Sequence, residues 1–197
     1  MKWFGLGVFG MAIVAGLFYM STYNGLVNKD ERVKQTYAQV QNVMQRQADL
    51  IPNLVETVKG YAGHESATLK AVTEARSALT AVAKLSPDQL AANPELQKQL
   101  IEAQANMGRQ LISLNAVREA YPELKANRQF LQLMAELTGS QNRITVERRN
   151  NQLAVQDYNG TVRRFPGSFI AANHGFTAKP YFEASAEAAA GPPKVKF

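Results

Sequence analysis

Apolar residues recur every three or four positions along most of the chain, which is the spacing of one face of an α-helix. The first apolar stripe predicts a long amphipathic helix over residues 26–61. Further stripes predict helices over residues 69–82, 94–137 and 144–165. No segment alternates apolar and polar residues as a half-buried strand does. The pattern therefore predicts an all-α protein.

The breaks between the stripes carry helix-end signals. Asn93 followed by Pro94 is typical of a helix start, with the asparagine as N-cap. Pro122 should kink or interrupt the third helix, and "TGSQN" at residues 138–142 predicts the turn into the fourth. Four helices with short connections predict an up-down-up-down antiparallel four-helix bundle over residues 24–166.

Pro52 lies in the middle of the first predicted helix. It has no N–H for the carbonyl of Ala48, and its ring bends the helix. If the fourth helix runs antiparallel to the first, Arg148 comes level with the turn before the proline and offers Asp49 a charge-assisted bond. We therefore predict a structural polar joint formed by Asp49, Pro52, Asn53 and Arg148. A tolerated kink with solvated neighbours is the alternative.

The stretch before the first amphipathic helix is apolar throughout. From Trp3 to Met20 about 18 residues carry no charge, which is near the minimum length of a membrane-spanning helix. Trp3 at one end, with Tyr19 and Tyr23 at the other, suits the two membrane interfaces, where aromatic rings are favoured. We predict an uncleaved transmembrane anchor over residues 1–23 and the lipid bilayer as a partner. A cleaved signal peptide is the alternative.

Charge and composition narrow the possible partners. The net charge is +6 and there is no cysteine, so disulfides, thiolate metal sites and a lipid-modified cysteine are excluded. The basic residues form no run, and adjacent arginines such as Arg163 and Arg164 point about 100° apart on a helix. We therefore expect no nucleic-acid partner. Anionic headgroups or an acidic partner fit the charge better.

Catalytic motifs are missing from the sequence. The two histidines, His64 and His174, are far apart, and there is no H-E-x-x-H, phosphate-binding glycine loop or nucleophile elbow. Glu65 beside His64 is explained by a helix start, where an acid is favourable. We predict a non-enzymatic protein with no cofactor and no metal site. A membrane-tethered bundle with an unrecognised hydrolytic or metal-binding site is the alternative.

Two further segments predict packing at one end of the bundle. The pentapeptide at residues 23–27, "YNGLV", recurs as "YNGTV" at residues 158–162, and the two copies should lie side by side. Residues 167–197 predict an irregular tail rich in glycine, proline and aromatic residues. The tail should be ordered as far as residue 182, either on the bundle or at the bilayer interface, because it holds too many apolar groups for a disordered linker. Residues 184–191 should be looser or only briefly helical.

Several motifs in a fixed order together resemble the LemA family. They are "YNGLV" after the apolar start, "RQADLIPNLVETVKGYAGHE", "AR" at residues 75–76, "YPELKANRQFLQLMAELTGSQNRI", "DYNGTVRRFPG", "GF", "YF" and the closing "PKVKF". The resemblance covers residues 23–197. It implies a helical-bundle domain tethered to a bacterial membrane and no catalytic residues. Relatives are associated with membrane organisation and with neighbouring membrane proteins.

The resemblance and the apolar start together predict a single-pass protein of the bacterial inner membrane. We expect an envelope scaffold that partners with copies of itself or with other membrane proteins. The basic residues after the apolar segment favour a cytoplasmic body. Lipoprotein members of the family imply a periplasmic or extracellular body, and we give this expectation more weight.

Overall fold

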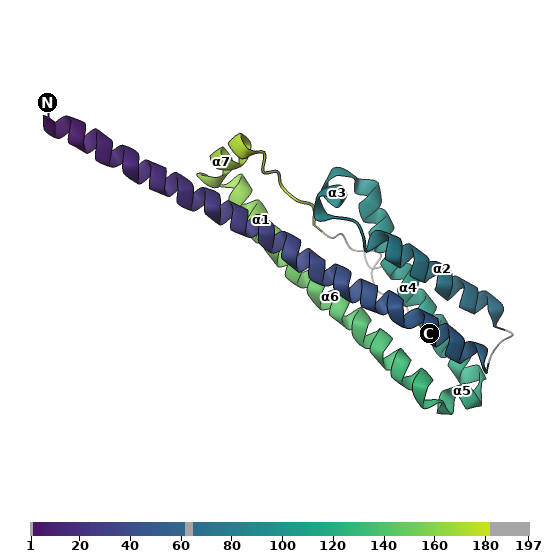
Figure 1. Cartoon of the computed structure of the whole chain (residues 1–197). Coiled ribbons are helices and arrows are strands. Elements are labelled where there is room, and N and C mark those ends of the chain that lie inside the picture. The colour runs from purple at the N-terminus through teal and green to yellow at the C-terminus, as the bar shows by residue number, and fades with distance from the viewer. Residues whose placement is uncertain (1, 62–64, 182–197) are drawn as a thin grey trace, which may run out of the picture. The chain divides into compact units, whose positions relative to one another are not determined.

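The computed structural model describes residues 2–61 and 65–181. These residues form helices and no strand (Figure 1), which confirms the all-α class. The helices are α1 (Lys2–Lys59), α2 (Ser66–Val82), α3 (Pro87–Ala92), α4 (Pro94–Ala120), α5 (Pro122–Ala126), α6 (Arg128–Arg163) and α7 (Gly167–His174). His64 and the tail beyond residue 181, including the region 184–191, lie outside the described residues.

The chain divides into two compact units. Among the described residues, unit 1 comprises residues 2–36 and 150–181, and unit 2 comprises residues 37–61 and 65–149. The long helices α1 and α6 therefore each contribute a segment to both units.

The structure contains the predicted helix start at Asn93 and the predicted break at Pro122. The side chain of Asn93 accepts a 2.9 Å hydrogen bond from the N–H of Glu95 at the start of α4, as its N-cap position predicted. The chain is extended at Tyr121, as is usual before a proline, so Pro122 ends α4 and opens α5. The first helix is longer than predicted, because α1 continues without a break from the apolar start.

The predicted turn at residues 138–142 is wrong, because these residues lie inside α6. A single glycine in a helix costs about 1 kcal/mol, which is less than the burial of the flanking Leu137 and Ile144 contributes. The break occurs instead at Asn127, whose side chain accepts a 2.9 Å bond from the N–H of Phe130. Asn127 therefore caps the helix that "TGSQN" was expected to open.

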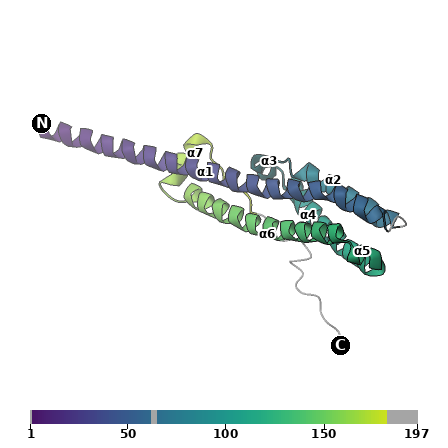
Figure 2. The ribbon, with the colours of Figure 1, turned by 60° about the horizontal axis from the view of Figure 1, so that its bottom comes forward.

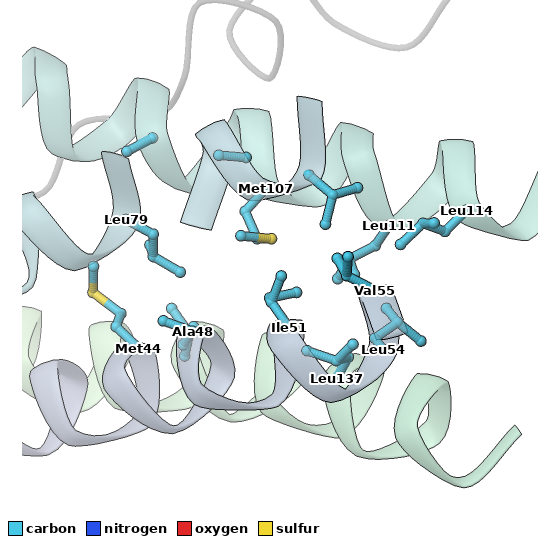
Figure 3. Close-up of a cluster of buried hydrophobic side chains, with 14 of the residues drawn as sticks. Met44, Ala48, Ile51, Leu54, Val55, Leu79, Met107, Leu111, Leu114 and Leu137 are labelled. Atoms are coloured by element: carbon cyan, nitrogen blue, oxygen red, sulfur yellow. The ribbon is translucent and has the colours of Figure 1, made fainter. Parts of the chain in front are cut away.

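Unit 2 is built around one apolar core, to which all six helices from α1 to α6 contribute. Figure 3 shows its central part, where Ile51 and Leu54 of α1 meet Met107 of α4 and Leu137 of α6. The predicted stripe on α1 is buried here, because Val40 and Met44 are almost fully covered. Each such side chain contributes about 1.5–3 kcal/mol on burial. Apolar packing therefore dominates unit 2.

Unit 1 has a smaller core, formed by α1, α6 and α7. Its buried members are Leu26, Val33, Val155, Tyr158, Ile170 and Ala171. Figures 1 and 2 both show α6 and α7 beside α1. Both copies of the repeated pentapeptide contribute to this core, since Leu26 and Tyr158 belong to it and Tyr23 and Val162 pack against it.

The first part of the tail is helical rather than irregular. The eight-residue helix α7 begins directly after Pro166 and ends at His174. The next residue, Gly175, has a φ of 73°, a left-handed conformation that glycine adopts without strain. Residues 175–181 then continue without helix. The glycine and proline content limits the length of the helix but does not prevent a short one.

Candidate functional sites in the two units

A polar joint is present at Pro52, with a different arginine from the one predicted. The carbonyl of Ala48, to which Pro52 has no N–H to donate, accepts a 3.0 Å bond from Nε of Arg76 on α2. Ala48 is buried, and an unsatisfied buried carbonyl costs about 1–3 kcal/mol. Arg76 therefore satisfies the acceptor that the proline leaves open.

The predicted bond between Asp49 and Arg148 is wrong. Asp49 is exposed and accepts a 2.8 Å bond from Gln45, one turn earlier in α1. The 2.9 Å bond between Gln47 and Gln141 aligns α1 with α6. Because the helices run antiparallel, Arg148 lies about two turns along α1 from that pair, on the side away from Asp49. The register therefore separates the two charges.

The other flanking residue, Asn53, is also exposed, and its backbone carbonyl accepts a 2.8 Å bond from the Thr57 hydroxyl. Its side chain therefore lies on the solvent side of α1, as does Pro52 itself. Of the residues proposed for the joint, only the proline takes part in it, through the carbonyl that it leaves free.

Arg148 lies on an apolar stripe because α4 offers it a buried amide. Its guanidinium donates a 2.9 Å bond to Oε1 of Gln104, and the amide of Gln104 donates a 3.2 Å bond to the sulfur of Met44. Burial lowers the pKa of Arg148 from its ordinary value. The arginine therefore links α6 to α4 through a polar bridge in the unit 2 core.

Unit 1 holds a charged clamp on its C-terminal segment. Nζ of Lys179 lies 3.0 Å from one carboxylate oxygen of Asp30, and Nζ of Lys34 lies 2.8 Å from the other. The side chains of Lys179 and Asp30 keep only 9% and 13% of their exposed area. Burial of Asp30 raises its pKa, but the bonds to Lys34 and Lys179 outweigh burial, so the net pKa lies below its ordinary value.

Hydrogen bonds from α6 hold the backbone of the same segment. The Asn159 amide donates to the carbonyl of Lys179 and accepts from its N–H, both at 2.8 Å. The Tyr158 hydroxyl donates to the carbonyl of Thr177 at 3.1 Å. The two copies of the pentapeptide therefore have different roles. Asn159 is buried and makes these hydrogen bonds, whereas its counterpart Asn24 is exposed.

The predicted interface tyrosines meet α7 and the residues after it. The Tyr19 hydroxyl lies 2.7 Å from Nε2 of His174, and the Tyr23 ring lies 4.7 Å from the His174 ring and 6.1 Å from that of Phe176. The third predicted residue, Trp3, is 88% exposed. In the part of the chain that the structure describes, α1 is the one helix long and apolar enough to cross a membrane, judged by length and composition.

A groove lies between α1 and α6 in unit 1, where the apolar stretch of α1 ends. Its volume is about 540 Å³. It is lined by Phe18, Thr22 and Lys29 of α1, by Leu153, Gln156, Asp157, Gly160 and Thr161 of α6, and by Arg164, Phe165, Pro166 and Gly167 of the following turn. Apolar side chains and charged side chains therefore share one concave surface.

The comparisons with known proteins identify the family. The sequence model of the LemA family matches residues 36–197, most of the chain. The chain belongs to the LemA family. Protein LemA of Metamycoplasma hominis is 25% identical over 178 residues, covering 88% of this chain and 75% of its own length. The resemblance drawn from the motifs is thus confirmed.

Two proteins with a different name are similarly related to this LemA-family chain. Magnetosome protein MamQ 2 of Paramagnetospirillum magneticum is 24% identical over 188 residues, covering 88% of this chain and 68% of the relative. Magnetosome protein MamQ of Magnetospirillum gryphiswaldense is 22% identical over 174 residues, with coverages of 81% and 64%. Their names place these relatives in the magnetosome.

Sequence reasoning missed the partners that matter most in this LemA-family chain. Arg76 lies in the second predicted helix but not on its apolar stripe, and local spacing did not identify it as the donor to the free carbonyl of Ala48. Lys179 lies in a tail without periodicity, so nothing in the sequence pointed to Asp30 as its partner. Among residues 2–61 and 65–181, no group of three or more His, Cys, Asp or Glu is placed to hold a metal ion.

Proposed function

We propose that this LemA-family chain is a non-enzymatic, single-pass scaffold of the bacterial inner membrane. Its body is an up-down-up-down four-helix bundle, carried on the start of α1 and lying on the periplasmic or extracellular side. Its partners are copies of itself or other membrane proteins. The observation that carries the proposal is the bare apolar surface at the start of α1.

Among the residues that the structure describes, that surface is continuous and, apart from the contact of Tyr19 with His174, bare. The side chains of residues 6–20 are all exposed, including Leu6, Phe9, Leu17 and Phe18 at 58–67%. Apolar patches of this extent are rare on proteins that remain in water, because exposing them forfeits about 25 cal/mol for each square ångström. The hydrocarbon core of a bilayer removes this cost.

The aromatic residues fit the dimensions of a bilayer. At 1.5 Å per residue, Trp3 and Tyr23 lie about 30 Å apart along α1, which is the thickness of a typical hydrocarbon core. Tyr23 and Tyr19 pack on α7, so the interface at that end would coincide with the start of the folded body. The two relatives named as magnetosome proteins support a membrane-associated role.

Membrane extraction tests the anchor. Membranes from cells making the full chain are washed with high salt and then with alkaline carbonate, and the wild type should remain in the pellet. A variant lacking residues 4–20 should appear in the wash. Protease added to spheroplasts should degrade the body of the wild type while a cytoplasmic marker survives.

The mass of the particle in mild detergent tests the scaffold. We expect native mass spectrometry to show more than one copy of the chain, or the chain together with a second membrane protein. Release of the wild type by carbonate would contradict the anchor. A monomer without any partner under conditions that preserve known membrane complexes would contradict the scaffold.

A further inference from the structure

We infer that the α1–α6 groove of unit 1 binds the phosphate headgroup of one anionic phospholipid. The inference rests on the membrane location proposed above and adds a specific ligand to it. The volume of the groove, about 540 Å³, lies within the range of about 300–1,000 Å³ that is usual for small-molecule sites.

The groove spans the change from apolar to polar surface along α1. Phe18 belongs to the bare apolar stretch, Thr22 lies one turn further, and Lys29 lies about 10 Å beyond Thr22 at 1.5 Å per residue. On the opposite wall, Phe165 is 84% exposed and follows Arg164 directly. A phospholipid has the same sequence of parts, with acyl chains below a charged phosphate.

The basic groups of the groove leave donors for an anion. Nζ of Lys29 bonds Oδ1 of Asp157 at 2.8 Å and Oγ1 of Thr161 at 2.9 Å, which uses two of its three donors. The guanidinium of Arg164 is exposed, and within the described parts of the chain no hydrogen bond or ion pair engages it. A phosphodiester between Lys29 and Arg164 would receive charge-assisted bonds from both.

The charge balance favours an anionic lipid over a zwitterionic one. Two cations and one carboxylate leave the groove with one positive charge, which matches a phosphodiester of charge −1. Asp157 is the one carboxylate among the lining residues, and its ion pair with Lys29 at 2.8 Å offsets its attraction for a headgroup ammonium. Arg163, the last residue of α6, is also exposed but does not line the groove.

The two adjacent arginines provide a matched test. Full-length protein is purified in mild detergent with equal amounts of phosphatidylglycerol and phosphatidylcholine, and retained lipid is measured by native mass spectrometry. The wild type should retain one phosphatidylglycerol. Arg164→Gln should weaken retention at least about tenfold, because it removes a charge-assisted hydrogen bond to the phosphate. Arg163→Gln makes the same change of charge and should retain lipid as the wild type does.

Further arms separate the possible sources of the signal. Glycerol 3-phosphate at millimolar concentration should not displace the lipid, and displacement would overturn the assignment in favour of a soluble phosphate ester. Equal retention of phosphatidylcholine, or equal loss in both arginine variants, would show only general attraction and would also overturn it. Equal thermal unfolding of the two variants confirms that both are folded.

A separate measurement tests whether the start of α1 inserts into the membrane. Carbonate extraction of the same variants reports membrane insertion regardless of bound lipid. Insertion without selective phosphatidylglycerol retention would reject the groove and leave the scaffold intact. Loss of insertion in the wild type would reject the proposed function itself.

Discussion

Units 1 and 2 each contain part of α1 and of α6, but different interactions stabilise the interior of each unit. Unit 2 buries a long apolar core to which six helices contribute. Unit 1 buries a short core and adds to it the clamp of Asp30 on Lys179 and the bonds of Asn159 to the backbone of residue 179. A small core contributes less on burial, so directional polar bonds carry a larger share of the stability there.

The difference has consequences for how each unit responds to change. Apolar packing is sensitive to lost volume and indifferent to mild changes of pH. A partly buried ion pair is sensitive to the loss of either charge. Hydrogen exchange read separately for the two units can therefore break or sharpen the comparison.

The largest effect is expected for Phe130→Ala in the unit 2 core. Phe130 is fully buried, and truncation of a buried phenylalanine typically costs about 3–5 kcal/mol. Amide protection in residues 37–149 should fall by this amount. The control is Leu131→Ala, the next residue of α6, which is 41% exposed and should cost less than about 1 kcal/mol. Equal effects of the two variants would contradict the assigned core.

Removing one charge of the clamp should give the next largest effect. Lys179→Met leaves Asp30 with Lys34 alone, and we expect a cost of about 3 kcal/mol, the lower end of the range for a broken buried pair. Exchange should rise first in residues 175–181. Lys29→Met is the matched control, because its partner Asp157 is 65% exposed and such pairs are worth about 0–1 kcal/mol.

Acid should act on the same clamp. The pKa of Asp30 is lower in the folded chain than in the unfolded one, so the unfolded chain binds its proton first as pH falls. The stability that Asp30 contributes is therefore complete above its ordinary pKa and is lost as pH falls through the lowered value. Urea unfolding of unit 1 at decreasing pH should show this loss. In the Asp30→Asn variant the loss of stability on acidification should be smaller. If the variant showed the same pH profile as the wild type, Asp30 would be excluded as the source of that loss.

A close backbone approach in unit 1 gives a smaller effect. A Cβ on Gly167 would collide with the carbonyl of Thr161, so Gly167→Ala should cost about 1–3 kcal/mol through a forced backbone shift. A Cβ on Gly160 meets nothing, and Gly160→Ala should stabilise α6 by about 0.5–1 kcal/mol. Thermal unfolding measures both. A Gly167→Ala protein as stable as the wild type would mean that the turn after α6 is looser than described.

The sequence predicted what depends on periodicity and failed where contacts join distant segments. The stripe of α1 and the cap at Asn93 follow from local spacing, and both are present. The turn at residues 138–142 failed because core packing outweighs the local preference of glycine and serine. The partner of the free carbonyl at Ala48 depends on how α2 is placed against α1, which local spacing does not reveal.

A coupling of about 1 kcal/mol tests the joint at Pro52. Arg76→Met removes the donor to the Ala48 carbonyl and should cost about 1–2 kcal/mol, the penalty of an unsatisfied buried acceptor. Pro52→Ala restores an N–H that can bond the same carbonyl. In the Pro52→Ala background Arg76→Met should therefore cost about 1 kcal/mol less, a coupling that a double-mutant cycle resolves by urea unfolding. Asn53→Ala, at the neighbouring exposed position, should not change the cost of Arg76→Met. Additive effects of Pro52→Ala and Arg76→Met would show that the arginine does not compensate for the proline.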